Sequence, residues 1–227
     1  NATTQNVRNL RPGMYSVTVT DSSTPFAVST TAQAIVPELE FVCGRDSIID
    51  VNGIRYATVQ IGNQCWTKSN LRTANRPNNP ELVINGRHCS GTNCNTLLGA
   101  HYTWNAAMDG EPAGQGVQGV CPTGWHIPSR SEFNQLRDYL AIDGNGGAGT
   151  NVPRKLLGAG SSSGFDALFA GNWGYSVFPG ENAVFWTSDE LPANAANAYY
   201  RLLNQFPIVQ EGNIDKRSGM SVRCIKD

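Results

Sequence analysis

Cys121-Pro-Thr-Gly-Trp-His-Ile-Pro128 runs directly into Ser129-Arg-Ser-Glu-Phe-Asn-Gln-Leu136, and this joined stretch decides how the middle of the chain folds. Ser129 and Glu132 have the spacing of a capping box, in which each side chain bonds the other residue's free backbone N–H. Apolar residues then recur at helical intervals until a Gly/Asn-rich segment begins. The stretch therefore predicts a helix over residues 130–141, preceded by a cysteine, a tryptophan and a proline.

The composition is that of a loop-rich protein with short strands. Only 15% of the 227 residues are charged, against about a quarter in ordinary globular chains, and there are 24 glycines and 12 prolines. The net charge is −1 and no basic cluster is present, which argues against a nucleic-acid partner. No apolar run approaches the ~18 residues of a membrane span, so we expect none in this chain.

Six cysteines, an even number in a Gly/Asn-rich chain, predict three disulfides and an oxidising compartment. Sequence spacing favours one pairing among the many that six cysteines allow. Cys89 and Cys94 close a tight loop, and Cys43 and Cys65 bracket a predicted hairpin over residues 48–61 with its turn at Asn-Gly. The remaining pair is Cys121 with Cys224.

Histidines are too few and too scattered to predict a zinc site. No CxxC or HExxH pattern accompanies them. His88, beside Cys89, is interpreted as a loop residue, and His126 as a partly packed residue after Trp125. The third histidine of the chain is His101.

The first 36 residues read as a separate β segment and linker, and residues 37–227 as one domain. Residues 10–21 alternate strictly, with Tyr15, Val17 and Val19 on one face, which predicts a half-buried strand entered through a Pro-Gly turn. Residues 29–34 read as a linker. The strand pattern resembles the last strands of immunoglobulin-like repeats in bacterial surface adhesins. The segment is too short for a seven-stranded sandwich, so it is either part of such a repeat or a strand that assembles with another chain.

Further along, three segments read as strands, one as a second short helix, and two as irregular loops. The strands are expected over 183–188, 198–203 and 220–225, the helix over 97–108, and the loops over 143–149 and 158–164.

Several ordered motifs resemble the Fibrobacter succinogenes major paralogous domain family. They are Val59-Gln-Ile-Gly-Asn-Gln-Cys-Trp66 with Asn70-Leu71, Gly99-Ala-His-Tyr-Thr-Trp-Asn-Ala-Ala-Met108, the Cys121–Pro128 block with Glu132-Phe133, Phe185-Trp-Thr-Ser188, and Ser221-Val-Arg-Cys224. Phe133 departs from the family pattern, where tryptophan is usual. The resemblance implies an α+β, C-type-lectin-like fold, similar to that of formylglycine-generating enzymes, and a place on the bacterial cell surface, as in adhesins of the Bacteroidetes. It implies no catalytic residue.

The leading functional hypothesis is a non-catalytic extracellular binding module that recognises glycan or protein through long loops. Four tryptophans, Trp66, Trp104, Trp125 and Trp186, lie in the motifs and are expected in the core. The fifth, Trp173, lies between glycines in a predicted loop. We therefore expect the ligand site at Trp173 and Tyr175, with Asn172 and Asn182 as polar partners.

Two alternatives come from other classes: a pilus-like or filament subunit that assembles through the N-terminal strand, and a formylglycine-generating-type enzyme, which would need reactive cysteines. No cofactor is expected. Calcium remains open, because it needs six to eight oxygen ligands. The only suggestive residues are Asp143, Asn145, Glu181 and Asp189.

Overall fold

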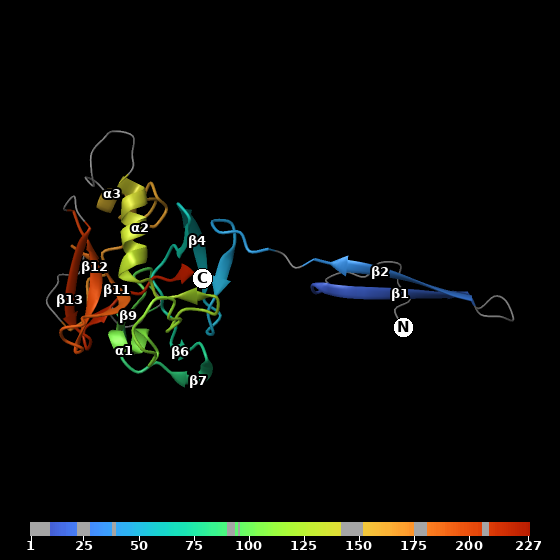
Figure 1. Cartoon of the computed structure of the whole chain (residues 1–227), viewed down its shortest axis with the longest axis horizontal. Helices are drawn as coiled ribbons and strands as arrows, with labels where there is room; N and C mark the ends of the chain where they lie inside the picture. Colours follow the sequence, from blue (N-terminus) through green and yellow to red (C-terminus); the bar gives the residue numbers. More distant parts are fainter. Residues whose placement is uncertain are drawn as a thin grey trace. The chain divides into compact units, whose positions relative to one another are not determined.

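A computed structural model describes residues 10–21, 28–37, 40–89, 94, 96–141, 152–174, 181–205 and 209–227. The chain divides into two compact units, Asn1–Val42 and Cys43–Asp227. Each unit contains its own strands, coloured from blue to red along the chain (Figure 1).

The first unit is a two-stranded antiparallel ribbon. Strands β1 (Gly13–Asp21) and β2 (Val28–Val36) pair over nine positions without a register shift. The predicted strand is therefore confirmed, but the linker prediction for residues 29–34 is wrong, because those residues pair with β1. The expected half-burial is wrong as well. Val17 and Val19 are 58% and 62% exposed, since no described residue covers their face.

The second unit is mostly β, with short helices and several small antiparallel sheets. Its helices are α1 (Trp104–Ala107), α2 (Arg130–Ala141) and α3 (Val152–Leu156). Its strands are β3 (Ser47–Ile49), β4 (Arg55–Ile61), β5 (Gln64–Thr67), β6 (Asn75–Arg76), β7 (Asn79–Val83), β8 (Arg87–Cys89), β9 (Ala100–Thr103), β10 (Trp125–His126), β11 (Ala183–Glu190), β12 (Asn197–Leu203), β13 (Gln210–Asp215), β14 (Gly219–Met220) and β15 (Ile225–Lys226). The sheets have the strand orders β10-β15-β5-β4-β3, β11-β12-β13, β14-β9-β8 and β6-β7.

Most of the predicted elements are confirmed. The β3–β4 hairpin turns where Asn-Gly stands, and α2 has the predicted bounds. The second helix is wrong in its first half, because residues 100–103 form β9 between β8 and β14 and only α1 is helical. The strand expected over 220–225 is split, because β14 pairs with β9 whereas β15 pairs with β5 and β10.

The main hydrophobic core lies where α2 contacts the sheets. Helix α2 lies alongside the β11-β12-β13 sheet (Figure 1). It buries Phe133, Leu136 and Leu140, which are the apolar residues that recur at helical intervals in the sequence. The Phe133 ring centroid lies 5.1 Å from that of Trp66, and Trp66 also contacts Phe165 edge-on. The four tryptophans expected in the core are all buried.

A buried arginine explains the Ser-Val-Arg-Cys motif near the C-terminus. Arg223 is 1% exposed, and its guanidinium donates to Asn70 Oδ1 at 2.8 Å and to three backbone carbonyls. Those carbonyls belong to Thr67, Phe165 and Asp166. Burial lowers the pKa of Arg223 to about 9. Arg223 thus ties the last strands to two distant loops, and its motif is structural.

Three disulfides close the second unit, with the pairing that spacing favoured. Cys43 is bonded to Cys65, Cys89 to Cys94, and Cys121 to Cys224, which are 103 residues apart. No cysteine is left free. Such bonds are consistent with an extracellular protein. Within the described residues no helix is long and apolar enough to cross a membrane.

His126, Ser129, Glu132 and Asp227 form a chain of hydrogen bonds that we call the capping network. Glu132 Oε2 accepts from the Ser129 backbone N–H at 2.7 Å, as the capping box predicts. Its Oε1 lies 2.8 Å from His126 Nε2, and His126 Nδ1 lies 2.6 Å from Asp227 Oδ1. Burial alone would lower the pKa of His126, but the two carboxylates outweigh it and raise that pKa. The network therefore fastens the start of α2 to the last residue of the chain.

Candidate functional site

Trp173 is the one tryptophan that faces solvent, and its backbone is held firmly. Its side chain is 44% exposed. Its N–H donates to the Gly219 carbonyl at 2.8 Å, and the Gly219 N–H donates back at 3.0 Å. This antiparallel bridge joins residue 173 to the edge of the β14-β9-β8 sheet. Gly219 allows this close approach, since an added Cβ would lie 3.0 Å from the Trp173 Cβ and would require a small shift of its neighbours. The indole is thus a fixed, half-exposed platform.

His88 stacks on one face of the Trp173 indole. The two ring centroids are 3.5 Å apart and the planes differ by 3°. The loop interpretation of His88 is wrong, because β8 places it directly opposite His101 of β9. Burial lowers the pKa of His88, which favours a neutral ring. With His88 on one side, the exposed area of Trp173 belongs to its other face and its edges.

Several buried polar atoms around the Trp173–Gly219 bridge have no hydrogen-bond partner in the part of the chain that is described. They are His101 Nε2, Ser218 Oγ and both amide atoms of Asn172. His101 is only 4% exposed and Ser218 only 1%. Leaving a buried donor or acceptor unpaired costs about 1–3 kcal/mol. Because buried polar groups are normally paired, this concentration beside an exposed aromatic ring indicates a place for bound water or for a ligand.

Burial lowers the pKa of His101, and its hydrogen bond to the Ala170 backbone only partly opposes this. A neutral imidazole that donates to a carbonyl through one nitrogen presents the other as an acceptor. Within the described residues, His101 Nε2 is therefore an unpaired acceptor with almost no solvent-accessible surface, and a buried water is the natural partner for such an atom. We call the group of His88, His101, Asn172, Trp173 and Ser218 the Trp173 site.

The structure brings only some of the predicted ligand residues together. Trp173 and Asn172 lie in the site. Asn182 is nearby through its backbone, which accepts from the Gly171 N–H, but its side-chain oxygen accepts from Asn204 at 3.2 Å. Tyr175 lies outside the described residues. The three residues that sequence reasoning missed, His88, His101 and Ser218, come from separate segments. Only the cross-strand pairing of β8 with β9 and the bridge at Gly219 bring them to Trp173.

Comparison with known protein families gives one match. The sequence profile of the Fibrobacter succinogenes major domain matches residues 59–226. The chain belongs to this family. No curated protein and no solved structure matches the chain. The lectin-like fold of the major domain therefore stays a prediction, while its mostly β architecture and disulfides are established.

Of the four calcium candidates in the major domain, the structure describes Glu181 and Asp189. Asp143 and Asn145 lie outside the described residues, and Glu181 is exposed. Asp189 Oδ2 accepts from the Arg130 backbone N–H at 2.6 Å, so this carboxylate serves the start of α2. Among the described residues, no three His, Cys, Asp or Glu side chains converge as metal ligands.

The capping network has the residue types of a hydrolase triad but not its geometry. A nucleophilic serine must lie within hydrogen-bond reach of its histidine base. Ser129 Oγ instead donates to Glu132 Oε2 at 2.7 Å. His126 has its hydrogen-bonding nitrogens taken by Glu132 and Asp227. These contacts fit a structural role.

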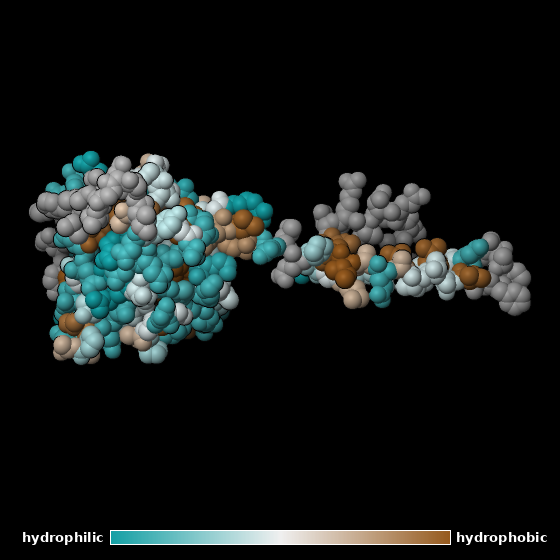
Figure 2. All heavy atoms as spheres, turned by 45° about the horizontal axis from the view of Figure 1, so that its top comes forward, coloured by the Kyte–Doolittle hydropathy of each residue, from teal (hydrophilic) through white to brown (hydrophobic). Residues whose placement is uncertain are grey.

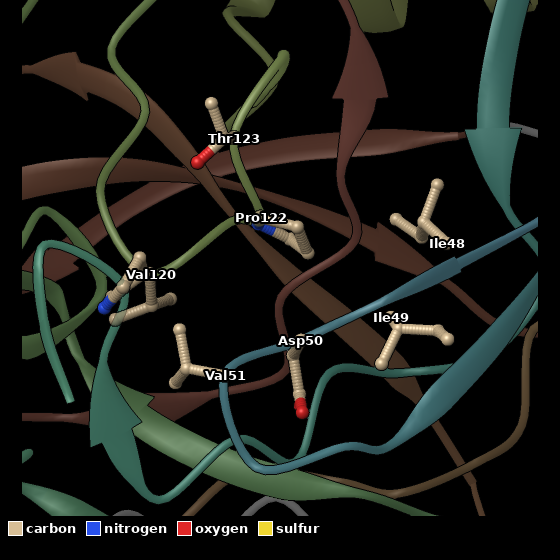
Figure 3. Close-up of a pocket in the computed structure, with 8 residues that line it drawn as sticks. Ile48, Ile49, Asp50, Val51, Val120, Pro122 and Thr123 are labelled. Carbon is tan, nitrogen blue, oxygen red and sulfur yellow. The ribbon is translucent and has the colours of Figure 1, made fainter. Parts of the chain in front are cut away.

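An apolar depression of about 350 Å³ lies beside the β3–β4 hairpin. Figure 3 shows residues 48–51 on one segment and Val120, Pro122 and Thr123 on another. Its one carboxylate, Asp50, already accepts the Asn52 and Ile54 backbone N–H groups and the Tyr56 hydroxyl. The depression thus offers little polar chemistry, and the Trp173 site is the stronger candidate.

Proposed function

We propose that the major domain of this protein is a non-catalytic extracellular binding module that holds a carbohydrate at the Trp173 site. The observation that carries the proposal is a fixed, half-exposed indole surrounded by buried polar atoms without partners. Three disulfides support an extracellular location.

The chemistry of the Trp173 site favours an uncharged, polyhydroxylated ring. The face of an indole is electron-rich, so it attracts the weakly positive C–H bonds that line one face of a sugar. Hydroxyl groups at the rim of that sugar both donate and accept hydrogen bonds. The unpaired atoms of His101, Asn172 and Ser218 are buried, so in this proposal they reach the sugar hydroxyls through bridging water.

Rigidity supports the same proposal. Ordering a mobile side chain on binding costs about 0.5–1.5 kcal/mol, so a preorganised platform loses less affinity. Both backbone hydrogen bonds of the Trp173–Gly219 bridge and the parallel stack on His88 fix the indole beforehand.

The non-catalytic part of the proposal rests on two observations. All six cysteines form disulfides, so none is free to supply the reactive thiol that a formylglycine-generating enzyme would need. Ser129, the serine nearest to a histidine–carboxylate pair, is bonded to Glu132.

A glycan array probed with the full chain tests the proposal. We compare wild type with Trp173→Ala and with Tyr139→Ala, which removes another surface aromatic that is 54% exposed and lies on α2. We expect glycan signals for wild type and Tyr139→Ala and their loss for Trp173→Ala. Absence of any signal, or signals that survive Trp173→Ala, would overturn the proposal.

A further inference from the structure

A polar pocket of about 260 Å³ lies beside α1, outside the Trp173 site. Its lining includes Arg76, Asn85, Thr103, Asn105 and Asp109, so it combines a carboxylate, a guanidinium and two amides. The Asp109 side chain is only 8% exposed, and its Oδ1 lies 3.2 Å from Arg76 Nε. We call this cavity the Asp109 pocket.

Asp109 is poorly paired for a carboxylate that is so well covered. Within the described residues it accepts no hydrogen bond, and Arg76 is its only ionic partner. Burial raises the pKa of Asp109, and the charge of Arg76 only partly opposes this effect. The backbone of Asp109 also adopts a φ of 52°, which is uncommon for a residue other than glycine. Desolvated carboxylates and strained residues are found preferentially at functional sites.

The Asp109 pocket adjoins the Trp173 site on the β14-β9-β8 sheet. His101 of that site and Thr103 of the pocket are alternate residues of β9, so their side chains share one face. Thr103 also lies directly opposite Gly219, the residue to which Trp173 is bridged. Such neighbouring positions of a sheet are about 5–7 Å apart. These two anchor points are therefore separated by about the length of one sugar unit.

We propose that the Asp109 pocket is a second sugar subsite, so that the ligand of the major domain is an oligosaccharide and not a single sugar. This inference rests on the proposed function of the Trp173 site. Two adjacent hydroxyls of a sugar match the pocket, because each can donate to the Asp109 carboxylate and accept from Arg76 or from an amide. They replace the water that otherwise supplies the missing hydrogen bonds.

The charges and the surface fit a neutral, polar ligand. Arg76 and Asp109 compensate each other, so the pocket favours no ligand charge of either sign. The face of the second unit drawn in Figure 2 is mostly hydrophilic, and its apolar residues are scattered. A chain of sugar units is polar along its whole length and suits such a surface. Because contacts at two linked positions reinforce each other, longer ligands should bind more tightly.

Binding of single sugars and of their oligomers tests the inference. The probes are glucose, galactose, mannose and N-acetylglucosamine, each on the array as the single sugar and as linear oligomers, with affinities measured by calorimetric titration. Asp109→Asn removes the charge but keeps the size, and asparagine tolerates a positive φ. The matched control, Asp138→Asn, changes another arginine-bound aspartate, which lies on α2.

For wild type and the control variant, we expect the oligomer to bind at least about tenfold more tightly than the single sugar. In Asp109→Asn this gain is lost, whereas binding of the single sugar at Trp173 is unchanged.

A second variant guards against a change at Asp109 that merely disturbs the fold. Asn85 is exposed, and its side chain has no hydrogen bond within the described residues. We expect Asn85→Ala to weaken oligomer binding roughly fivefold without lowering the thermal unfolding temperature.

The possible failures are distinguishable. Binding that needs Trp173 but is equally tight for single sugar and oligomer, or is unchanged in both pocket variants, would overturn this inference and leave the proposed function standing. Absence of any binding, or binding that survives Trp173→Ala, would overturn both.

Discussion

Two tryptophan–histidine neighbourhoods in the major domain differ in how their polar atoms are paired. Beside the capping network Trp125 is buried, and within the network both His126 nitrogens have carboxylate partners. In the Trp173 site, the indole is half exposed and His101 Nε2 has no partner among the described residues. Since buried polar groups in stable structure are normally paired, the first neighbourhood fits a stabilising role, and the second is the one to which we assign binding in our proposal.

Each neighbourhood has its own disulfide, and removing them should give the largest difference in stability. We expect Cys121→Ala/Cys224→Ala to lower the free energy of unfolding by about 4–5 kcal/mol, because it opens a long loop, and Cys89→Ala/Cys94→Ala by about 2 kcal/mol. Urea unfolding followed by circular dichroism measures both. A larger loss of stability from Cys89→Ala/Cys94→Ala than from Cys121→Ala/Cys224→Ala would contradict the stabilising role assigned to the first neighbourhood.

Truncating the two tryptophans should separate stability from binding. Trp125→Ala removes a buried ring and should cost about 3–5 kcal/mol of unfolding free energy. Trp173→Ala loses a half-exposed stack worth about 1 kcal/mol, yet it should abolish binding of any glycan found on the array. Thermal unfolding and calorimetric titration of each variant measure the two effects. Equal loss of stability would contradict the comparison.

The capping network also predicts a dependence on pH. Because the pKa of His126 is raised, this residue stabilises the folded state fully at pH values below its ordinary pKa of 6.5. That stabilisation is lost as the pH rises through the pKa of the folded state. Burial would raise the pKa of Glu132, but bonds from His126 and Ser129 lower it, so its contribution is present above 4.5 and is lost on acidification. The network is thus most stabilising between these values.

His126→Gln isolates this effect. Hydrogen bonds to charged groups are worth about 2 kcal/mol, so we expect the variant to be less stable by about that amount near pH 5.5 and by less as pH rises above neutrality. Urea unfolding across the pH range measures the difference. Burial lowers the pKa values of His88 and His101, so their effect on stability changes with pH in the opposite direction. Wild type and His126→Gln both contain these two histidines, so this effect cancels when the two are compared. A difference in unfolding free energy between wild type and variant that grows with rising pH would contradict a charged His126.

The smallest expected effect is at the helix start itself. Ser129→Ala removes one side-chain cap of α2 and should cost about 1 kcal/mol, with no change in glycan binding. Thermal unfolding and the array measure these two outcomes. A loss of binding would mean that the two neighbourhoods are coupled.

Local patterns were sufficient for the capping network but not for the Trp173 site. The capping box and the α2 stripe depend on residues three or four positions apart, which a sequence displays directly. The stack of His88 on Trp173 joins residues 85 positions apart. It depends on β8–β9 pairing and on the Gly219 bridge, and neither has a periodic signal.

The ribbon shows a related limit of sequence reasoning. Strict alternation in β1 predicted its strand, but residues 28–36 mix small and hydroxyl side chains that are also common in linkers. Their role is decided by pairing with β1. Burial could not be predicted either, because alternation shows which face is apolar and not whether another layer covers it.

Two-dimensional NMR of the five tryptophan indole N–H groups tests the central claim most directly. The full chain, labelled with ¹⁵N, is titrated with a glycan that scores on the array. The account predicts that the Trp173 signal, assigned with Trp173→Phe, moves with ligand concentration while the four buried indoles stay in place. A Trp173 signal that is unchanged at saturation, or a buried indole that moves instead, would contradict it.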